Sequence, residues 1–120
     1  CIPTQTSQND KCIPNVMYIY DGTQYCYKLS LGDKIEQDWD STESTCNENQ
    51  FTSNSVIGRS TGNKEGTYDN GAHCPTVGRN RSTNVTIEKD SSISKYSATI
   101  TEPQTCKYEV KLKVPSKDIC

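Results

Sequence analysis

The sequence predicts an all-β fold, a flattened barrel or sandwich of two antiparallel sheets crosslinked by disulfide bonds. Three observations support this prediction. Ser, Thr and Asn, at 13, 14 and 9 residues, make up 36 of the 120 residues, a composition that favours short strands and polar loops over helices. No window keeps apolar residues at helical spacing for long enough to indicate an amphipathic helix. Seven cysteines are spread along the chain without a C-x-x-C pair, which is typical of disulfides rather than of a zinc site.

The clearest strand covers residues 108–114, where Tyr108, Val110, Leu112 and Val114 alternate with charged residues. This alternation predicts one buried and one solvated face. Further strands are expected at 16–20, 25–31, 81–88 and 94–101, with turn signals at 21–22 and 32–33. Residues 38–49, which include Trp39, are expected to form a loop or short helix, and the Gly-rich segment 58–70 a polar loop.

Composition also excludes several functions and favours one domain over residues 1–120. The chain has no apolar run of about eighteen residues or more, so we expect no membrane insertion of this segment. A net charge of −2 without a basic stripe argues against nucleic-acid binding. The single histidine, His73, cannot complete a metal cluster, and no nucleophile motif surrounds a serine, so we expect no metal, no cofactor and no enzymatic activity.

Two sequons for N-glycosylation, at Asn80 and Asn84, fall within one expected strand. Period-two geometry places both asparagines on one face, and Arg81 on the opposite face with Val85 and Ile87. An arginine among apolar neighbours needs a partner, because an uncompensated buried charge is unfavourable. Arg81 therefore either meets a polar ligand or forms an edge salt bridge.

Four segments occur in a characteristic order: 67–74 (TYDNGAHC), 78–85 (GRNRSTNV), 102–108 (EPQTCKY) and 115–120 (PSKDIC). Together they resemble the mannose 6-phosphate receptor homology (MRH) domain, a lectin domain. The resemblance covers residues 66–120 well and 12–60 loosely, and leaves 1–11 as a poorly matched extension. Within this family, the segment at 78–85 is similar to the version in the glucosidase II β-subunit, and the 68–74 loop is similar to that of endoplasmic-reticulum degradation lectins.

The resemblance implies a site in which a Gln, an Arg, a Glu and a Tyr hold a terminal mannose. By motif, these are Arg81, Glu102 and Tyr108, with Gln50 as the first choice for the glutamine and Gln37 as the second. The residue types suit a sugar, because hydroxyl groups both donate and accept hydrogen bonds. Arginine supplies a rigid fork of donors, glutamate only accepts, and glutamine and tyrosine do both.

The resemblance further implies two disulfides, Cys12–Cys26 and Cys74–Cys106. Where the family has a cysteine eight residues after the binding arginine, this chain has Lys89. The usual partner of Cys120 is therefore missing, and Cys120 is expected to pair with Cys46 or Cys1. An odd number of cysteines leaves one thiol free or paired outside the chain.

Phosphate-binding members of the family carry an Asp, an Asn and a His in the loop before the cysteine, and Asp69, Asn70 and His73 resemble that set.

The sequence leaves three hypotheses for the function. The first is a lectin module for mannose-terminated N-glycans, acting in glycoprotein processing, quality control or sorting. The alternatives are a luminal interaction or trafficking domain of the same fold without a sugar site, and a mannose 6-phosphate receptor-type domain.

A chain that begins at Cys1 without Met is expected to be a processed or excised segment. Its expected compartment is the lumen of the secretory pathway (endoplasmic reticulum, Golgi or endolysosomal) or the extracellular space, which disulfides and N-glycans both require. Its expected partners are mannose-terminated N-glycans and a catalytic or transmembrane partner segment, to which tethering would strengthen weak binding.

Overall fold

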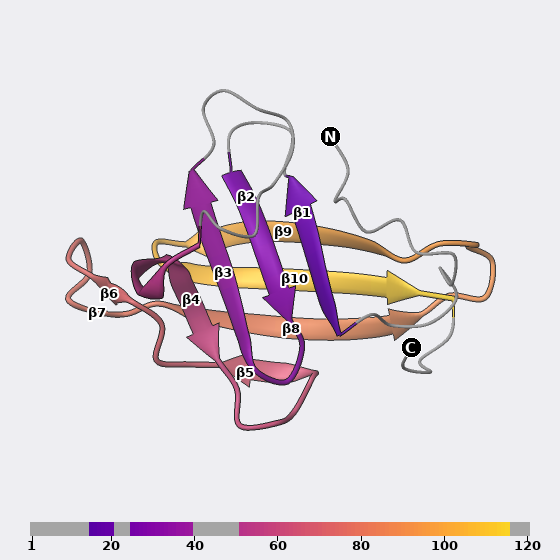
Figure 1. The fold of residues 1–120 in the computed structure, drawn as a ribbon, viewed down its shortest axis with the longest axis horizontal. Coiled ribbons are helices and arrows are strands. Elements are labelled where there is room, and N and C mark those ends of the chain that lie inside the picture. The colour runs from indigo at the N-terminus through magenta and orange to yellow at the C-terminus, as the bar shows by residue number, and fades with distance from the viewer. Residues whose placement is uncertain (1–14, 21–24, 40–50, 116–120) are drawn as a thin grey trace.

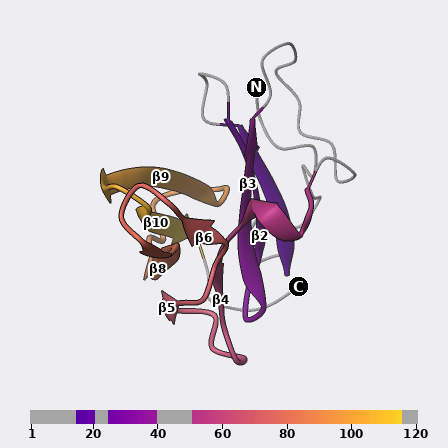
Figure 2. The ribbon, with the colours of Figure 1, turned by 90° about the vertical axis from the view of Figure 1, so that its left-hand side faces the viewer.

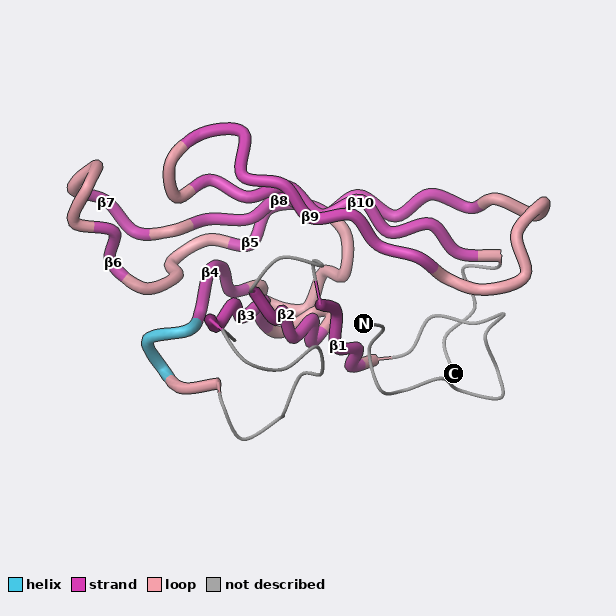
Figure 3. The backbone as a smooth tube through the Cα atoms, turned by 90° about the horizontal axis from the view of Figure 1, so that it is seen from above, coloured by secondary structure: helices cyan, strands magenta, loops and turns pink. Residues whose placement is uncertain are grey.

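A computed structural model of the chain describes residues 15–20, 25–39 and 51–115. These residues form strands and one short 3-10 helix, η2 (Ser53–Ser55), and no α-helix. They build two packed layers of sheet, and strands of one layer cross those of the other steeply (Figures 1 and 3). The fold is therefore all-β and sandwich-like, as predicted, and not a closed barrel.

The first sheet is antiparallel and has the strand order β1-β2-β3-β4. Its strands are β1 (Val16–Tyr20), β2 (Tyr25–Ser30), β3 (Lys34–Trp39) and β4 (Val56–Arg59). The turn between β2 and β3 contains Gly32 at φ +81°, a conformation that glycine adopts without strain. This is the turn that the sequence indicates at 32–33.

The second sheet has the order β5-β8-β10-β9 and contains both parallel and antiparallel pairs. Its strands are β5 (Gly66–Tyr68), β8 (Ser82–Lys89), β9 (Ser97–Gln104) and β10 (Lys107–Val114). The expectation of purely antiparallel sheets is wrong here, because β8 and β10 run parallel. The physical reason is the connection between these strands. After β8 the chain forms the antiparallel β9–β10 hairpin, and β10 lies between β8 and β9 in the sheet. Because β10 runs opposite to β9, it runs in the same direction as β8.

A small third sheet pairs β6 (His73–Cys74) with β7 (Arg79–Asn80). It forms a hairpin that extends from one end of the sandwich (Figures 1 and 2). This hairpin and η2 lie at the same end of the molecule as the β9–β10 turn (Figure 1). That end carries the site described below.

The hydrophobic core fills the space between the two large sheets. The alternation predicted for 108–114 is confirmed, since Tyr108, Val110, Leu112 and Val114 are buried and the lysines between them are exposed. On β8, Val85 and Ile87 point into the same core. The opposing sheet contributes apolar side chains from β1 to β4: Met17, Tyr27, Leu29, Ile35 and Ile57.

The strands expected at 16–20 and 25–31 are confirmed, and that at 94–101 is displaced to Ser97–Gln104. The expected polar loop at 58–70 is wrong in part, because it contains the end of β4 and all of β5. Both strands are short, and Gly58 of β4 packs directly on Tyr68, where a Cβ would lie 2.5 Å from the Tyr68 carbonyl oxygen. Residues 38 and 39 belong to β3, and residues 40–49 lie outside the described part.

Candidate functional site

A cavity of about 380 Å³ opens between the sheets at the end where η2 and the β9–β10 turn lie. This volume falls at the lower end of the range for small-molecule sites. Most of its lining side chains are polar, and they come from both sheets and from the turns between strands. The lining residues are Tyr25, Gln37, Asn54, Ser55, Ile57, Cys74, Thr76, Arg81, Glu102, Thr105, Cys106 and Tyr108.

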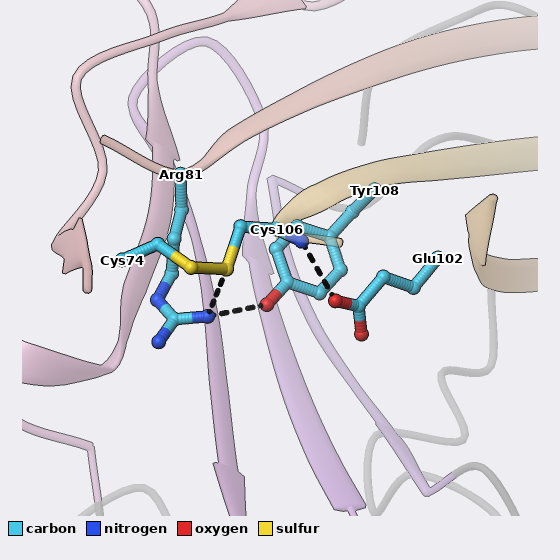
Figure 4. The surroundings of a disulfide bond; sticks show 5 residues. All are labelled: Cys74, Arg81, Glu102, Cys106 and Tyr108. Carbon is cyan, nitrogen blue, oxygen red and sulfur yellow. Dashed lines mark hydrogen bonds between the residues drawn. A yellow bond between two sulfur atoms is a disulfide. The ribbon is translucent and has the colours of Figure 1, made fainter. Parts of the chain in front are cut away.

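Arg81 lies between β7 and β8, and the neighbouring loop fixes its backbone. The Arg81 N–H donates to the Ala72 carbonyl at 3.0 Å, and the Arg81 carbonyl accepts from the Gly71 N–H at 2.9 Å. Its half-buried side chain donates from Nη1 to the Tyr108 hydroxyl oxygen at 3.0 Å. The same Nη1 lies 3.0 Å from the Cys106 sulfur (Figure 4). The guanidinium thus has partners and still presents further N–H donors.

Tyr108, near the start of β10, is 4% exposed and lies beside Thr83 of the parallel strand β8. Burial raises the pKa of the Tyr108 hydroxyl, while the neighbouring Arg81 opposes that rise. The phenol is therefore protonated at neutral pH. Because its oxygen accepts from Arg81, its proton can be donated to a ligand oxygen.

Glu102 lies on β9, just before the turn to β10. One carboxylate oxygen, Oε2, accepts from the Cys106 N–H at 2.8 Å. Cys106 forms a disulfide with Cys74 of β6, as the resemblance implies. Figure 4 shows Arg81, Tyr108 and Glu102 grouped around this disulfide. The structure therefore brings together the guanidinium, phenol and carboxylate that were singled out in the sequence.

The two candidate glutamines differ in placement. Gln37 of β3 lines the cavity, and its Nε2 donates to the Tyr27 hydroxyl at 3.0 Å. An amide held in this way has a second N–H and a carbonyl oxygen to offer a ligand. Gln50, the first choice from the sequence, lies outside the described residues. The geometry favours Gln37 as the fourth polar group.

Five polar lining residues were not singled out in the sequence: Tyr25, Asn54, Ser55, Thr76 and Thr105. Tyr25 shares a strand face with Tyr27, so the period-two pattern of β2 could have placed it facing the other sheet. The other four lie in η2 or in turns. Sequence patterns carry little information on where a turn residue points, because that direction depends on the packing of the whole loop.

The candidate phosphate ligands Asp69, Asn70 and His73 are exposed, and none of them lines the cavity. The backbone of Asp69 instead pairs with Arg59 of β4, and His73 pairs with Asn80 across the small hairpin. The loop points these three residues outward because it packs Gly71 against β4 and Arg81. A Cβ on Gly71 would lie 2.7 Å from the Ile57 carbonyl carbon and 2.8 Å from the Arg81 carbonyl oxygen.

The expectation that both sequons fall within one strand is wrong, because Asn80 ends β7 and Asn84 belongs to β8, with Arg81 between the two strands. Within β8 the two predicted faces are confirmed, since Asn84 is exposed while Val85 and Ile87 face the core. Asn80 is exposed as well. Cys26 is disulfide-bonded, and its partner lies outside the described residues. Cys1, Cys12, Cys46 and Cys120 all lie there too, so the remaining pairings stay predictions.

Within residues 15–20, 25–39 and 51–115, no group of three or more His, Cys, Asp or Glu side chains is arranged to hold a metal ion. In the same ranges, no helix has the length and apolar character needed to cross a membrane.

The fold is similar to that of known structures. The crystal structure of the MRH domain of glucosidase II beta bound to mannose matches with a TM-score of 0.51 and 26% sequence identity, over 76% of this chain and 80% of that chain. The solution structure of a tryptophan-to-alanine point mutant of the GBII-beta MRH domain gives a TM-score of 0.49 and 27% identity over the same shares. No family model matches the sequence, and no curated protein matches it significantly. The first similarity shows a shared arrangement of sheets over most of both chains.

Proposed function

Because the chain is an MRH-like domain, we propose that it is a lectin module that binds the terminal mannose of N-glycans. The similar structure of the glucosidase II beta domain is a complex with mannose, and this supports a sugar ligand here. No part of the proposal requires catalysis. The site residues proposed to hold the sugar are Gln37, Arg81, Glu102 and Tyr108.

The observation that carries this proposal is the convergence of Arg81, Tyr108 and Glu102 on one cavity of about 380 Å³. A hexose presents a ring of hydroxyl groups, each able to donate and accept. Arg81 donates, Glu102 accepts, and Tyr108 and Gln37 can do both. Such a set selects mannose over glucose if it bonds the axial 2-hydroxyl, because a sugar with that hydroxyl elsewhere leaves buried polar groups unpaired.

The test is binding of the chain to a glycan array that carries mannose-, glucose- and phosphomannose-terminated structures, followed by calorimetry with methyl α-mannoside. We expect selective binding of mannose-terminated glycans, and loss of binding in Arg81→Ala and Glu102→Gln with unchanged circular dichroism. Lys111→Ala, an exposed position on β10 outside the cavity lining, is the matched control and should bind as the wild type does. A wild type that binds no glycan would support a fold that serves only as an interaction domain.

The same array tests the phosphomannose alternative. If His73 held a phosphate, affinity for mannose 6-phosphate would exceed that for mannose. We expect no preference for the phosphorylated sugar and no effect of His73→Ala, because His73 does not line the cavity. A preference for the phosphorylated sugar that His73→Ala removes would favour the receptor-type reading.

We also propose that the chain works in the lumen of the secretory pathway, in glycoprotein processing, quality control or sorting. The Cys74–Cys106 disulfide and the exposed sequon asparagines support an oxidising compartment. A single site for one sugar binds weakly, so tethering to a catalytic or membrane-bound partner segment would supply the effective concentration that the site lacks.

A further inference from the structure

Cys106, which forms the disulfide with Cys74, contacts both charged residues of the proposed sugar site (Figure 4). Arg81 Nη1 lies 3.0 Å from the Cys106 sulfur, and the Cys106 N–H donates to Glu102 Oε2 over 2.8 Å. No ion pair joins Arg81 directly to Glu102 within the residues that the structure describes. One residue thus holds the guanidinium with its side chain and the carboxylate with its main chain.

The backbone of Cys106 has an unusual conformation at the point where its N–H contacts Glu102. Cys106 has φ +63°, in the left-handed region that residues with a side chain rarely adopt. It lies in the tight turn between β9 and β10, and its N–H donates back to Glu102 of β9. Its partner Cys74 is 1% exposed and belongs to the β6–β7 hairpin. The crosslink therefore ties the strained turn to a buried anchor.

We propose that Cys106, held by its disulfide to Cys74, is a positioning residue of the sugar site that orients Arg81 and Glu102 toward one ligand. This inference rests on the proposed mannose-binding function. Its consequence is that the crosslink sets affinity for the sugar as well as stability. A disulfide that only crosslinks the chain would affect stability alone.

Two double variants test whether Cys106 positions the site or whether the disulfide only crosslinks the chain. Cys74→Ala/Cys106→Ala and Cys74→Ala/Cys106→Gly both lack the crosslink and the sulfur that faces Arg81. Glycine adopts positive φ without strain and keeps the N–H aimed at Glu102, whereas alanine favours relaxation of the turn. The matched control is Val114→Ala, a core truncation at the opposite end of β10 that lowers stability without touching the cavity.

Affinity for methyl α-mannoside is measured by calorimetry at a temperature at which circular dichroism shows every variant folded. We expect the alanine double variant to bind about tenfold more weakly than the wild type, the effect of about one lost hydrogen bond to a charged group. The glycine double variant should bind more tightly than the alanine one, and Val114→Ala should bind as the wild type does. Equal affinities of the wild type and both folded double variants would overturn the proposal.

A second readout does not depend on the sugar. Glu102→Gln should move the chemical shift of the residue 106 amide proton upfield in the wild type, because an amide oxygen is a weaker acceptor than a carboxylate, and should move it less in the alanine double variant. If the wild type binds no mannoside, the proposed function fails, and this comparison still decides the positioning role. A Cys106 amide shift that Glu102→Gln leaves unchanged would overturn it.

Discussion

At the scale of single residues, the candidate site divides hydrogen-bond donors and acceptors between neighbouring side chains. The Tyr108 oxygen accepts from Arg81, and this leaves the phenol proton for a ligand. Glu102 is fixed through one oxygen by the Cys106 N–H, and its second oxygen can accept from a hydroxyl group. Each group is thus partly satisfied by the protein, which orients it without using up its capacity for a ligand.

Tyr108→Phe removes one hydroxyl and keeps the ring that packs in the core. The Arg81 guanidinium loses an acceptor, and the proposed ligand loses a donor. Hydrogen bonds to charged groups contribute about 1.5–3 kcal/mol, so we expect mannoside affinity to fall about tenfold to a hundredfold. Calorimetry measures this change, and thermal unfolding serves as the control for intact packing. Unchanged affinity would remove Tyr108 from the site.

The choice between Gln37 and Gln50 is also decided at this scale. Gln37 lines the cavity and is held by the Tyr27 hydroxyl, so Gln37→Ala should weaken mannoside binding about tenfold by removing a positioned amide. Gln50→Ala should bind as the wild type does. Calorimetry on both variants gives the answer, and the reverse result would return the fourth role to Gln50.

At the scale of elements, the site depends on how the loop from β5 to β6 packs against β4 and Arg81. Gly71 donates its N–H to the Arg81 carbonyl, and Ala72 accepts from the Arg81 N–H and donates to Val56 of β4. The loop therefore aligns the residue that leads into β8 with the edge of the first sheet. This contact explains why the motif at 68–74 needs a glycine at its centre.

Gly71→Ala should disturb both stability and binding. The new Cβ would lie 2.7 Å from the Ile57 carbonyl carbon and 2.8 Å from the Arg81 carbonyl oxygen, and both are main-chain atoms that a rotamer change cannot move. Overpacking of this kind costs about 1–3 kcal/mol, and the shift of Arg81 should weaken mannoside binding as well. Denaturant unfolding and calorimetry measure the two effects. A variant with wild-type values for both would show that the loop does not position Arg81.

At the scale of the whole molecule, one buried hydroxyl links the two sheets. Tyr68 of β5 is fully buried, and its hydroxyl accepts from the Gly32 N–H of the β2–β3 turn at 2.8 Å. It donates to the Lys64 carbonyl at 2.7 Å. The sandwich is therefore joined by polar contacts at its edge as well as by the apolar core.

Tyr68→Phe leaves the Gly32 N–H and the Lys64 carbonyl without this partner, which should lower the free energy of unfolding by about 1–3 kcal/mol at neutral pH. Burial raises the pKa of Tyr68 above the ordinary tyrosine value of 10.0. As the pH rises above 10, the hydroxyl of Tyr68 therefore ionises in the unfolded chain before it does in the folded one. This ionisation lowers the free energy of unfolding of the wild type, whereas the phenylalanine variant has no hydroxyl to ionise at this position. The difference in free energy of unfolding between the wild type and Tyr68→Phe, measured by denaturant titration, should therefore become smaller above pH 10. A difference that stays constant would contradict a buried, neutral phenol.

The sequence by itself determined the all-β class and the buried face of 108–114, because period-two alternation is a local property of the chain. Its short motifs, through their resemblance to a lectin domain, also singled out Arg81, Glu102 and Tyr108 as candidates for the site. It did not determine that β8 and β10 run parallel, that β4 and β5 exist, or that Gln37 lines the cavity. These features depend on contacts between segments far apart in sequence, such as Gly58 on Tyr68 and Gly71 on Arg81, and on which edge of a sheet a strand joins. Only the folded sandwich brings those segments together, and with them the groups of the candidate site.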